Sequence, residues 1–295
     1  MLTKKQFGIL EYLSEEGSAS QRKISEAVKM SVGIVNKTVK ELEQLHLIKN
    51  GEITDTGYKA LEPYRAKRAI FIAAGFGSRL VPVTLNTPKP LVRVNGKRII
   101  ETLLDAVVAA EIEEIYIVRG YLGEQFDELL YKYPNITFID NPIYNEANNI
   151  SSALLAAGFM KNAYVLEADL YMYNPKLIKK YQYNSNYLGV KVDKTDDWCF
   201  HTDKHLNIKS MGIGGVDCYH MYGVSYWDEE QGSKLPKYIK AVYESPGGKE
   251  RYWDQVALEY YIDKFSVSVR ECTFDDIIEI DTFNELKKLD KAYDV

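Results

Sequence analysis

Two glycines, a serine and two basic residues are closely spaced after an apolar run in this chain. The run covers residues 69–74, Gly75 and Gly77 follow it, and the polar residues are Ser78, Arg79 and Lys89. A glycine-rich turn after a buried strand allows backbone N–H groups to approach phosphate oxygens, because no Cβ atom intervenes. Arginine and lysine side chains bind phosphate by hydrogen bonds and by charge. The spacing therefore predicts a site for a phosphorylated ligand.

The pattern in residues 75–91 is Gly-x-Gly-Ser-Arg-Leu-x-Pro-x-Thr-x-x-x-Pro-Lys-Pro-Leu. It lacks the third glycine of the dinucleotide fingerprint and the Gly-Lys-Ser/Thr of a P-loop. It resembles the signature of the nucleoside-triphosphate transferases that make nucleotide sugars and CDP-alcohols. The alternative is an ordinary turn after a strand with an unrelated lysine nearby, but the many fixed positions favour the signature.

A second candidate site residue follows the apolar run 163–166, where the sequence reads AYVLEADL. A strand here would place Glu167 and Asp169 at its carboxyl end, where open α/β sheets bind ligands. Asp169 is therefore predicted to be a metal ligand. A capping role in the following turn is the alternative.

The composition is that of a globular protein with no membrane partner. Hydrophobic residues make up 46% of the 295 residues, charged residues make up 27%, and the formal net charge is −5. No stretch approaches 18 apolar residues, and no secretory pattern begins the chain, so we expect a cytoplasmic protein. The three cysteines form no CxxC pair, and we expect them to be reduced. His201 and His205 are expected in a surface hairpin rather than a zinc site.

Residues 1–62 are predicted to form a winged helix-turn-helix domain that resembles the MarR-like type. Helices are expected before Gly17, after Ser20 and after Ser31, followed by a two-stranded wing that turns at residues 50–51. Ala27 is expected to face inward on the second helix. The third helix is expected to bury Ile34, Val35, Val39, Leu42 and Leu45.

Whether this domain binds DNA is open. The third helix would present Asn36, Lys37 and Lys40 to a DNA groove. Residues 1–66 contain ten Lys and Arg against nine Asp and Glu, a balance of +1. DNA-binding domains usually carry more positive charge. An interaction or dimerisation module, including one that makes a homodimer, is an equal alternative.

Residues 63–68 are predicted to be a linker, and residues 69–295 a nucleotidyltransferase domain. Strand and helix patterns alternate through the first part of this range, which builds a mainly parallel sheet with helices on both faces. Residues 185–228 are rich in strands and turns, so antiparallel strands should extend the sheet. The expected fold is therefore a mixed α/β domain after a small winged-helix α+β domain.

From about residue 67 onward the chain resembles the choline-phosphate cytidylyltransferases of the LicC type. The similar segments are IVRGYLGEQFDEL, NPIYNEANNISSAL, LEADL, RYWDQVALE and IIEIDTFNEL. The resemblance implies that CTP and phosphocholine are converted to CDP-choline and pyrophosphate with Mg²⁺ as cofactor. It implies the metal ligands Asp169 and Asp281 and the catalytic residues Lys89 and Arg79.

The resemblance also implies two binding regions. The nucleotide would be bound by Ala73, Ala74, Gly75, Gly77, Ser78, Arg79, Asn149 and Ser152. The acceptor would be bound by Trp198, Tyr252, Asp254 and Glu279. Aromatic faces suit a quaternary ammonium, which cannot donate hydrogen bonds.

The chain departs from this family in ways that leave alternatives. The winged helix is an addition, and Leu170 stands where the family often has an acidic residue or asparagine. The acceptor could instead be phosphoethanolamine, 2-aminoethylphosphonate or a sugar 1-phosphate. A transcriptional regulator with a ligand-sensing transferase-like domain is the other alternative, although sensing alone does not require two metal aspartates.

Overall fold

The computed structural model describes residues 1–294, which form two compact units. The first unit contains Met1–Arg65 together with Tyr181–Tyr183, and the second contains Ala66–Lys180 and the chain from Asn184 onward. The second unit begins at Ala66, within the predicted linker, and is interrupted by three residues that belong to the first.

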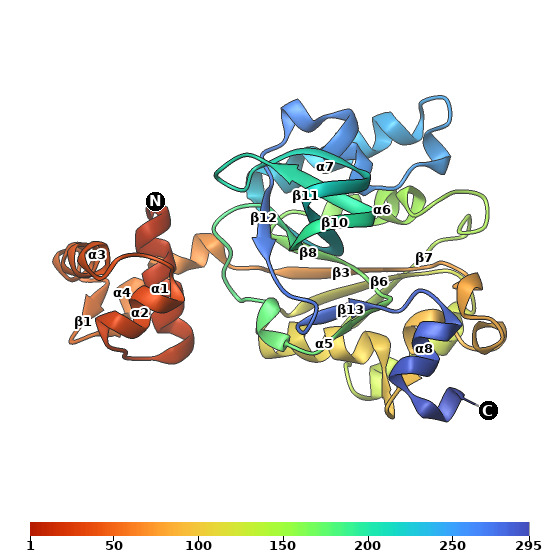
Figure 1. The fold of residues 1–295 in the computed structure, drawn as a ribbon, viewed down its shortest axis with the longest axis horizontal. Coiled ribbons are helices and arrows are strands. Elements are labelled where there is room, and N and C mark those ends of the chain that lie inside the picture. The colour runs from red at the N-terminus through yellow and green to blue at the C-terminus, as the bar shows by residue number, and fades with distance from the viewer. Residues whose placement is uncertain (295) are drawn as a thin grey trace. The chain divides into compact units, whose positions relative to one another are not determined.

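The first unit is a winged helix. Each helix begins after a side chain that accepts a backbone N–H, which removes one of the unpaired donors at a helix start: Thr3, Ser20, Ser31 and Thr54. Its elements are α1 (Lys4–Glu16), α2 (Gln21–Ala27), α3 (Val32–Gln44), β1 (Ile48–Lys49), β2 (Glu52–Ile53) and α4 (Asp55–Leu61). The predicted order of elements is therefore confirmed (Figure 1).

The buried face of α3 differs from the predicted one. Val35, Thr38 and Leu42 are buried, and they follow the i, i+3, i+7 spacing of one helix face. Ile34 and Leu45, both predicted to face inward, are 37% and 54% exposed. The prediction was wrong because Thr38, a polar residue, occupies the core position that the apolar residues on either side were expected to take. Ala27 on α2 is exposed as well.

The segment from α2 to α3 carries most of the exposed positive charge of the winged helix. Residues 21–40 contain five exposed basic residues and one acidic residue: Arg22, Lys23, Lys29, Lys37, Lys40 and Glu26. The near-neutral balance of the whole domain conceals this local difference. Binding to DNA stays a prediction.

Residues 181–183 complete the core of the winged helix. The ring of Tyr183 lies 5.3 Å from that of Phe7 and stacks on Tyr64 at 5.6 Å. Tyr181 is 3% exposed and packs in the same cluster. The backbone N–H of Gln182 donates to the carbonyl of Tyr64 at 2.9 Å. No sequence pattern indicated that this segment, placed in the predicted transferase domain, would pack in the core of the first unit.

The second unit is built on a mixed sheet with the strand order β12-β10-β11-β8-β3-β6-β7. Neighbouring strands are parallel from β8 through β3 and β6 to β7, whereas β11 is antiparallel to both β8 and β10. The strands are β3 (Arg68–Ala73), β6 (Glu114–Arg119), β7 (Ile136–Asp140), β8 (Ala163–Glu167), β10 (Asn186–Thr202), β11 (Ile208–Trp227) and β12 (Ser268–Glu271).

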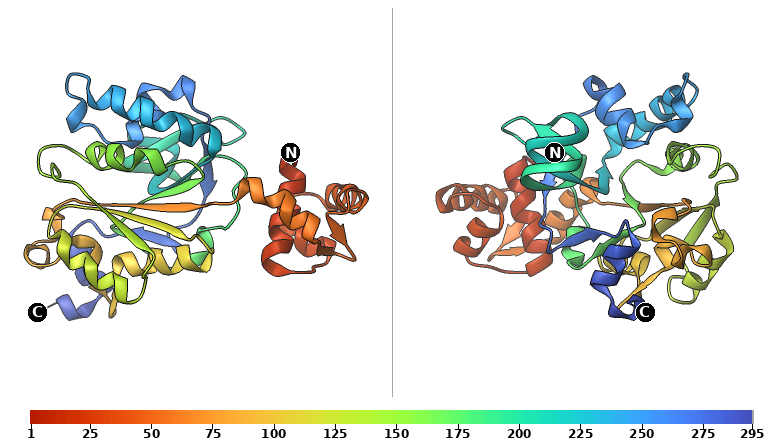
Figure 2. Two further views of the ribbon diagram at one scale, coloured as in Figure 1. Left: turned by 180° about the vertical axis from the view of Figure 1, so that it is seen from behind. Right: turned by 45° about the vertical axis from the view of Figure 1, so that its right-hand side comes forward.

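The central strand β3 contributes to a core on each face of the sheet. Ala69, Phe71 and Ala73 pack in one core with α5 (Ile99–Ala109). Ile70 and Ile72 pack in the other with α6 (Ile150–Ala156) and α7 (Glu229–Tyr243). Alternate residues of a strand point to opposite faces, so an uninterrupted apolar strand fits a sheet covered on both sides. Figures 1 and 2 show helices on both faces.

The remaining elements frame the carboxyl ends of the central strands. They are the pairs β4 (Arg93–Val94) with β5 (Lys97–Arg98) and β9 (Leu170–Met172) with β13 (Ile277–Glu279), and the helix α8 (Phe283–Leu289). Residues 256–264 form a π-helix, Val256–Tyr260, and a short 3₁₀ turn. Within residues 1–294, no helix is long and apolar enough to cross a membrane.

The contribution of Tyr183 to the winged-helix core can be measured in the full-length protein. We expect Tyr183→Ala to lower the stability of this unit by about 2 kcal/mol, since a large ring is removed from a partly buried aromatic cluster. Amide hydrogen exchange in α1 and α4 should accelerate, while exchange in β3 should not. Tyr183→Phe, which keeps the ring, is the control. Unchanged exchange of α1 in the alanine variant would contradict this role.

Candidate active site

A cavity of about 450 Å³ in the second unit is lined by every residue that the sequence predicted for the site. These are Ala73, Ala74, Gly75, Gly77, Ser78, Arg79, Lys89, Asn149, Ser152, Asp169, Trp198, Tyr252, Asp254, Glu279 and Asp281. The last residue of β3 and the segments after β8 and β13 contribute to the lining, so the cavity lies where the predicted strands end.

The signature loop closes tightly because residue 77 is glycine. Gly77 has a left-handed backbone with a φ of +62°, and a Cβ atom there would lie 2.8 Å from Cβ of Lys89. The Thr84 hydroxyl donates to the carbonyl of Gly77 at 2.9 Å and holds the loop in this shape. A residue larger than glycine would push Lys89 away from the cavity.

Lys89 lies between two carboxylates. Its Nζ atom is 2.8 Å from Oδ2 of Asp169 and 3.0 Å from Oδ1 of Asp281, and the residue is 7% exposed. Burial by itself lowers the pKa of Lys89, but the charges and hydrogen bonds of the two aspartates outweigh it and the pKa is raised. Arg79 binds Asp281 through both terminal nitrogens, at 2.9 Å and 2.8 Å. The two predicted catalytic cations thus contact the two predicted metal ligands.

Three carboxylates gather beside Lys89. Oxygen atoms of Asp169, Glu279 and Asp281 lie within 4.8 Å of one another. The pairing of β9 with β13 brings them together, since Leu170 lies opposite Glu279. Burial, followed by the charges of Asp169 and Asp281, raises the pKa of Glu279 to about 9. The sequence placed Glu279 with the acceptor, whereas the structure places it in this acidic cluster.

The acidic cluster has the chemistry of a divalent cation site. Its donors are carboxylate oxygens, the ligands that hard cations prefer. Oδ1 of Asp169 is buried and has no hydrogen-bond partner among residues 1–294. A buried oxygen without a partner is costly, and a bound cation would satisfy it. The residues present therefore fit a divalent metal.

Asn141 and two serines form a polar wall that sequence reasoning identified only in part. The Asn141 side chain donates to the hydroxyls of Ser151 and Ser152, both at 3.0 Å. Ser152 was predicted, but Asn141 and Ser151 were not. Asn141 follows the last residue of β7, so the rule that ligands bind at the carboxyl ends of strands would have found it.

Aromatic and acidic residues line another part of the cavity. The rings of Trp198 and Tyr252 meet edge to face at 5.8 Å. Asp254 is 4% exposed and accepts a hydrogen bond of 2.5 Å from the Tyr187 hydroxyl. Burial raises the pKa of Asp254 to about 6, although the bond from Tyr187 acts in the opposite direction.

Glu167 is a second acid of this cavity, with a half-buried side chain, and it was not among the predicted site residues. Burial, and then the charge of Asp254, raises its pKa well above the usual value. A Cβ atom at Gly223 would lie 2.3 Å from Oε2 of Glu167, so glycine there leaves space for the carboxyl group. Its position two residues before Asp169 could have identified Glu167 as a site residue.

Comparison with known families assigns both parts of the chain. A model of the nucleotidyl transferase family matches residues 68–197, and a model described as winged helix-turn-helix DNA-binding matches residues 2–49. The second match confirms the resemblance predicted for the first domain.

Characterised relatives match most of the chain. The 2-aminoethylphosphonate cytidylyltransferase of Lancefieldella rimae is 36% identical, over 76% of this chain and 92% of its own. The choline-phosphate cytidylyltransferase of Streptococcus pneumoniae is 33% identical, over 76% of this chain and 97% of its own.

Solved structures give the same fold. The CTP:phosphocholine cytidylyltransferase of Streptococcus pneumoniae superimposes with a TM-score of 0.71 at 33% identity, covering 77% of this chain and 99% of that one. These matches confirm the predicted mixed α/β fold and the predicted enzyme class. The chain belongs to the nucleotidyl transferase family, as a cytidylyltransferase that also carries a winged helix-turn-helix domain.

Proposed function

We propose that the protein joins CTP and phosphocholine to form CDP-choline and pyrophosphate, with Mg²⁺ as cofactor. The observation that carries the proposal is the combination of charges and rings in one cavity. Arg79 and Lys89 with the acidic cluster suit a metal-bound triphosphate, while Trp198 and Tyr252 beside buried acids suit a cationic acceptor.

The proposed reaction is one in-line substitution at phosphorus. An oxygen of the acceptor phosphate forms a bond to the α-phosphorus of CTP as the bond to the β-phosphate oxygen breaks, and pyrophosphate leaves with that electron pair. No covalent intermediate on the protein is required. The protein must therefore position two anions and neutralise their repulsion.

The residues beside the acidic cluster would neutralise this charge. Asp169, Asp281 and Glu279 would hold Mg²⁺, which neutralises and orients phosphate oxygens when it is bound. With these carboxylates engaged, Lys89 would be available to the attacking and α-phosphates, and Arg79 to the departing pyrophosphate. Both side chains need only exchange carboxylate partners for phosphate partners.

The nucleotide would bind along the signature loop. The backbone from Ala73 to Gly77 lines the cavity, as do Ser78 and Ser152. Glycine at 75 and 77 permits close approach of the base and phosphates to N–H groups. Cytosine as the base is supported by the two cytidylyltransferase relatives, both about one third identical.

A second acceptor, 2-aminoethylphosphonate, is favoured by a specific observation. Glu167 and Asp254 are acids that line the cavity, Glu167 half-buried and Asp254 buried. Carboxylates accept hydrogen bonds that a primary ammonium can donate and a trimethylammonium cannot. The Lancefieldella rimae relative is a 2-aminoethylphosphonate cytidylyltransferase. The Trp198 and Tyr252 rings favour the quaternary ammonium.

The acceptor and base can be identified by measuring pyrophosphate release. CTP, UTP, dTTP and GTP should each be combined with phosphocholine, 2-aminoethylphosphonate, phosphoethanolamine and glucose 1-phosphate. We expect the largest kcat/KM for CTP with phosphocholine. A larger kcat/KM with 2-aminoethylphosphonate would show that this compound is the acceptor, and the proposed reaction would still hold. If none of these combinations releases pyrophosphate, the proposed transferase function is refuted.

The role of Lys89 can be tested by substitution. We expect Lys89→Ala to lower kcat by about 10²–10³, as the loss of one transition-state donor does in other enzymes. CTP affinity should change much less, because Arg79 and the loop backbone still contact the phosphates. Lys89→Arg keeps the charge and is the matched control. An alanine variant with normal turnover would rule out this role.

The raised pKa of Asp254 predicts a pH dependence of acceptor binding. A cation is attracted to the ionised carboxylate, which is lost as the pH falls through about 6. The KM for phosphocholine should therefore rise between about pH 7 and pH 5. The acceptor phosphate titrates in the same range, so Asp254→Asn provides the control. Identical pH profiles for the variant and the wild type would show that Asp254 does not bind the cation.

A further inference from the structure

The acceptor side of the cavity includes a segment that is hydrogen-bonded to the residues just before α6. This segment, residues 249–254, carries Tyr252 and Asp254. The Asn148 backbone N–H donates to the carbonyl of Lys249 at 2.7 Å, and the Asn148 side chain donates to the carbonyl of Glu250 at 3.2 Å. Two bonds from one asparagine therefore fix the beginning of the segment.

Asn149 fixes the end of the same segment. Its Oδ1 atom accepts the backbone N–H of Trp253 at 2.9 Å, and its Nδ2 atom donates to Oε1 of Glu167 at 3.4 Å. The Trp253 donor sets the orientation of the amide, because the reversed amide would place two donors against each other. Both polar ends of Asn149 are thus engaged within the protein.

Tyr187 holds the acid of the segment from the opposite side. Its hydroxyl donates to Oδ1 of Asp254 at 2.5 Å. The ring is fully buried and packs against Phe200, Trp227 and Trp253 at centroid distances of 5.5, 6.0 and 6.3 Å. A side chain packed in this way has little freedom, so Asp254 is bonded to a fixed donor.

We propose that Asn149 and Tyr187 are positioning residues for the acceptor, which fix residues 252–254 so that Tyr252 meets Trp198 and Asp254 faces the cation. This inference rests on the proposed function and replaces the nucleotide contact first predicted for Asn149. Tyr187 is not among the residues that line the cavity, and Asn149 lines it with both of its polar side-chain atoms already bonded to the protein. Their loss should therefore affect the acceptor and spare the nucleotide.

Steady-state kinetics separate this role from a nucleotide contact. In Asn149→Ala and in Tyr187→Phe, we expect the KM for phosphocholine to rise roughly tenfold or more, as when a hydrogen bond to a charged group is lost. The KM for CTP and the kcat at saturating acceptor should stay near the wild-type values. Ser152→Ala is the matched comparison and should raise the KM for CTP instead. If Asn149→Ala raises the KM for CTP as much as that for phosphocholine, the inference is overturned.

Hydrogen exchange tests the same role without any substrate. Asn149→Ala removes the acceptor of the Trp253 amide, so exchange in residues 249–254 should accelerate by about tenfold or more. Asn149→Asp keeps an oxygen for this amide but loses the donor to Glu167, so its exchange should accelerate less than that of the alanine variant. Equal exchange in the alanine variant and the wild type would refute the inference. This result is decisive even if the wild type uses neither phosphocholine nor 2-aminoethylphosphonate, an outcome that would count against the proposed function.

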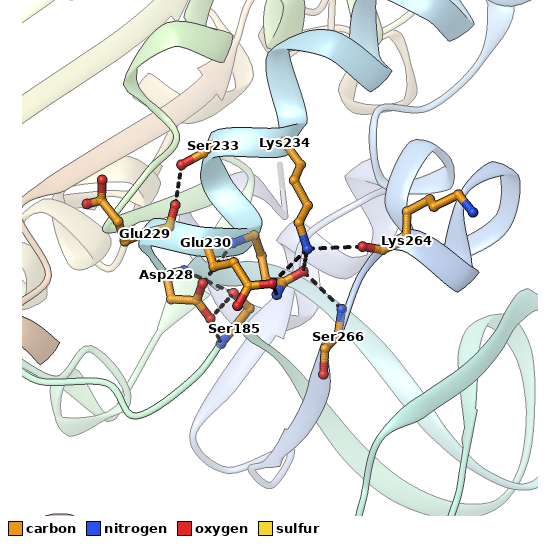
Figure 3. A network of polar contacts seen from close by, with 9 residues as sticks. Ser185, Asp228, Glu229, Glu230, Ser233, Lys234, Lys264 and Ser266 are labelled. Carbon is orange, nitrogen blue, oxygen red and sulfur yellow. Dashed lines mark hydrogen bonds and ion pairs between the residues drawn. The ribbon is translucent and has the colours of Figure 1, made fainter. Parts of the chain in front are cut away.

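The support for Tyr187 extends to the helix that follows β11. Two residues earlier on the chain, Ser185 donates through its hydroxyl to Asp228 at 2.8 Å and through its backbone N–H at 3.0 Å. Figure 3 shows this contact among the polar bonds at the start of α7. Ser185→Ala should therefore loosen Tyr187 and produce a smaller rise in the acceptor KM than Tyr187→Phe. If neither variant changes the KM for the acceptor, Tyr187 does not have the proposed role.

Discussion

The ion pairs of Lys89 hold together carboxylates that would otherwise repel one another in a buried cavity. Two unit charges at the 4.8 Å limit that encloses the acidic cluster repel by about 3–4 kcal/mol at an effective dielectric constant of 20. Lys89 contacts Asp169 and Asp281 directly and offsets this repulsion. The signature loop carries Lys89 to this contact, and the pairing of β9 with β13 brings the acids to it.

The balance of charge in the cavity also limits what it can bind. Six acidic residues line it with two basic side chains, Arg79 and Lys89, and the acids are Glu167, Asp169, Asp197, Asp254, Glu279 and Asp281. A free triphosphate would add further negative charge, so binding is favourable only when cations accompany it. An acceptor that carries its own ammonium group brings one of them. This charge balance supports the proposed combination of a metal-bound nucleotide with a zwitterionic acceptor.

Where chemistry and local geometry coincide, sequence patterns selected residues that the structure brings to one cavity. The signature residues, Asp169 and Asp281 follow strands or tight turns whose positions the apolar pattern reveals. The first residues of helices could also be predicted, because the side chains of Ser20 and Ser31 accept hydrogen bonds from nearby backbone N–H groups. The place of Glu279 in the acidic cluster could not be predicted in this way. It depends on a strand pairing with a segment more than a hundred residues earlier. The exposure of Ile34 and Leu45 depends on which helix faces meet, which a single helix pattern does not determine.

The position of residues 181–183 also has a consequence for the order of folding during synthesis. Tyr181 and Tyr183 lie in the core of the winged helix, yet they are made after the whole of β3, β6, β7 and β8. Roughly 120 residues separate Arg65 from Tyr183, and ribosomes add about 5–20 residues per second, so the delay is about 6–24 s. The winged helix therefore waits, with part of its apolar surface uncovered, until half of the transferase sheet has been translated.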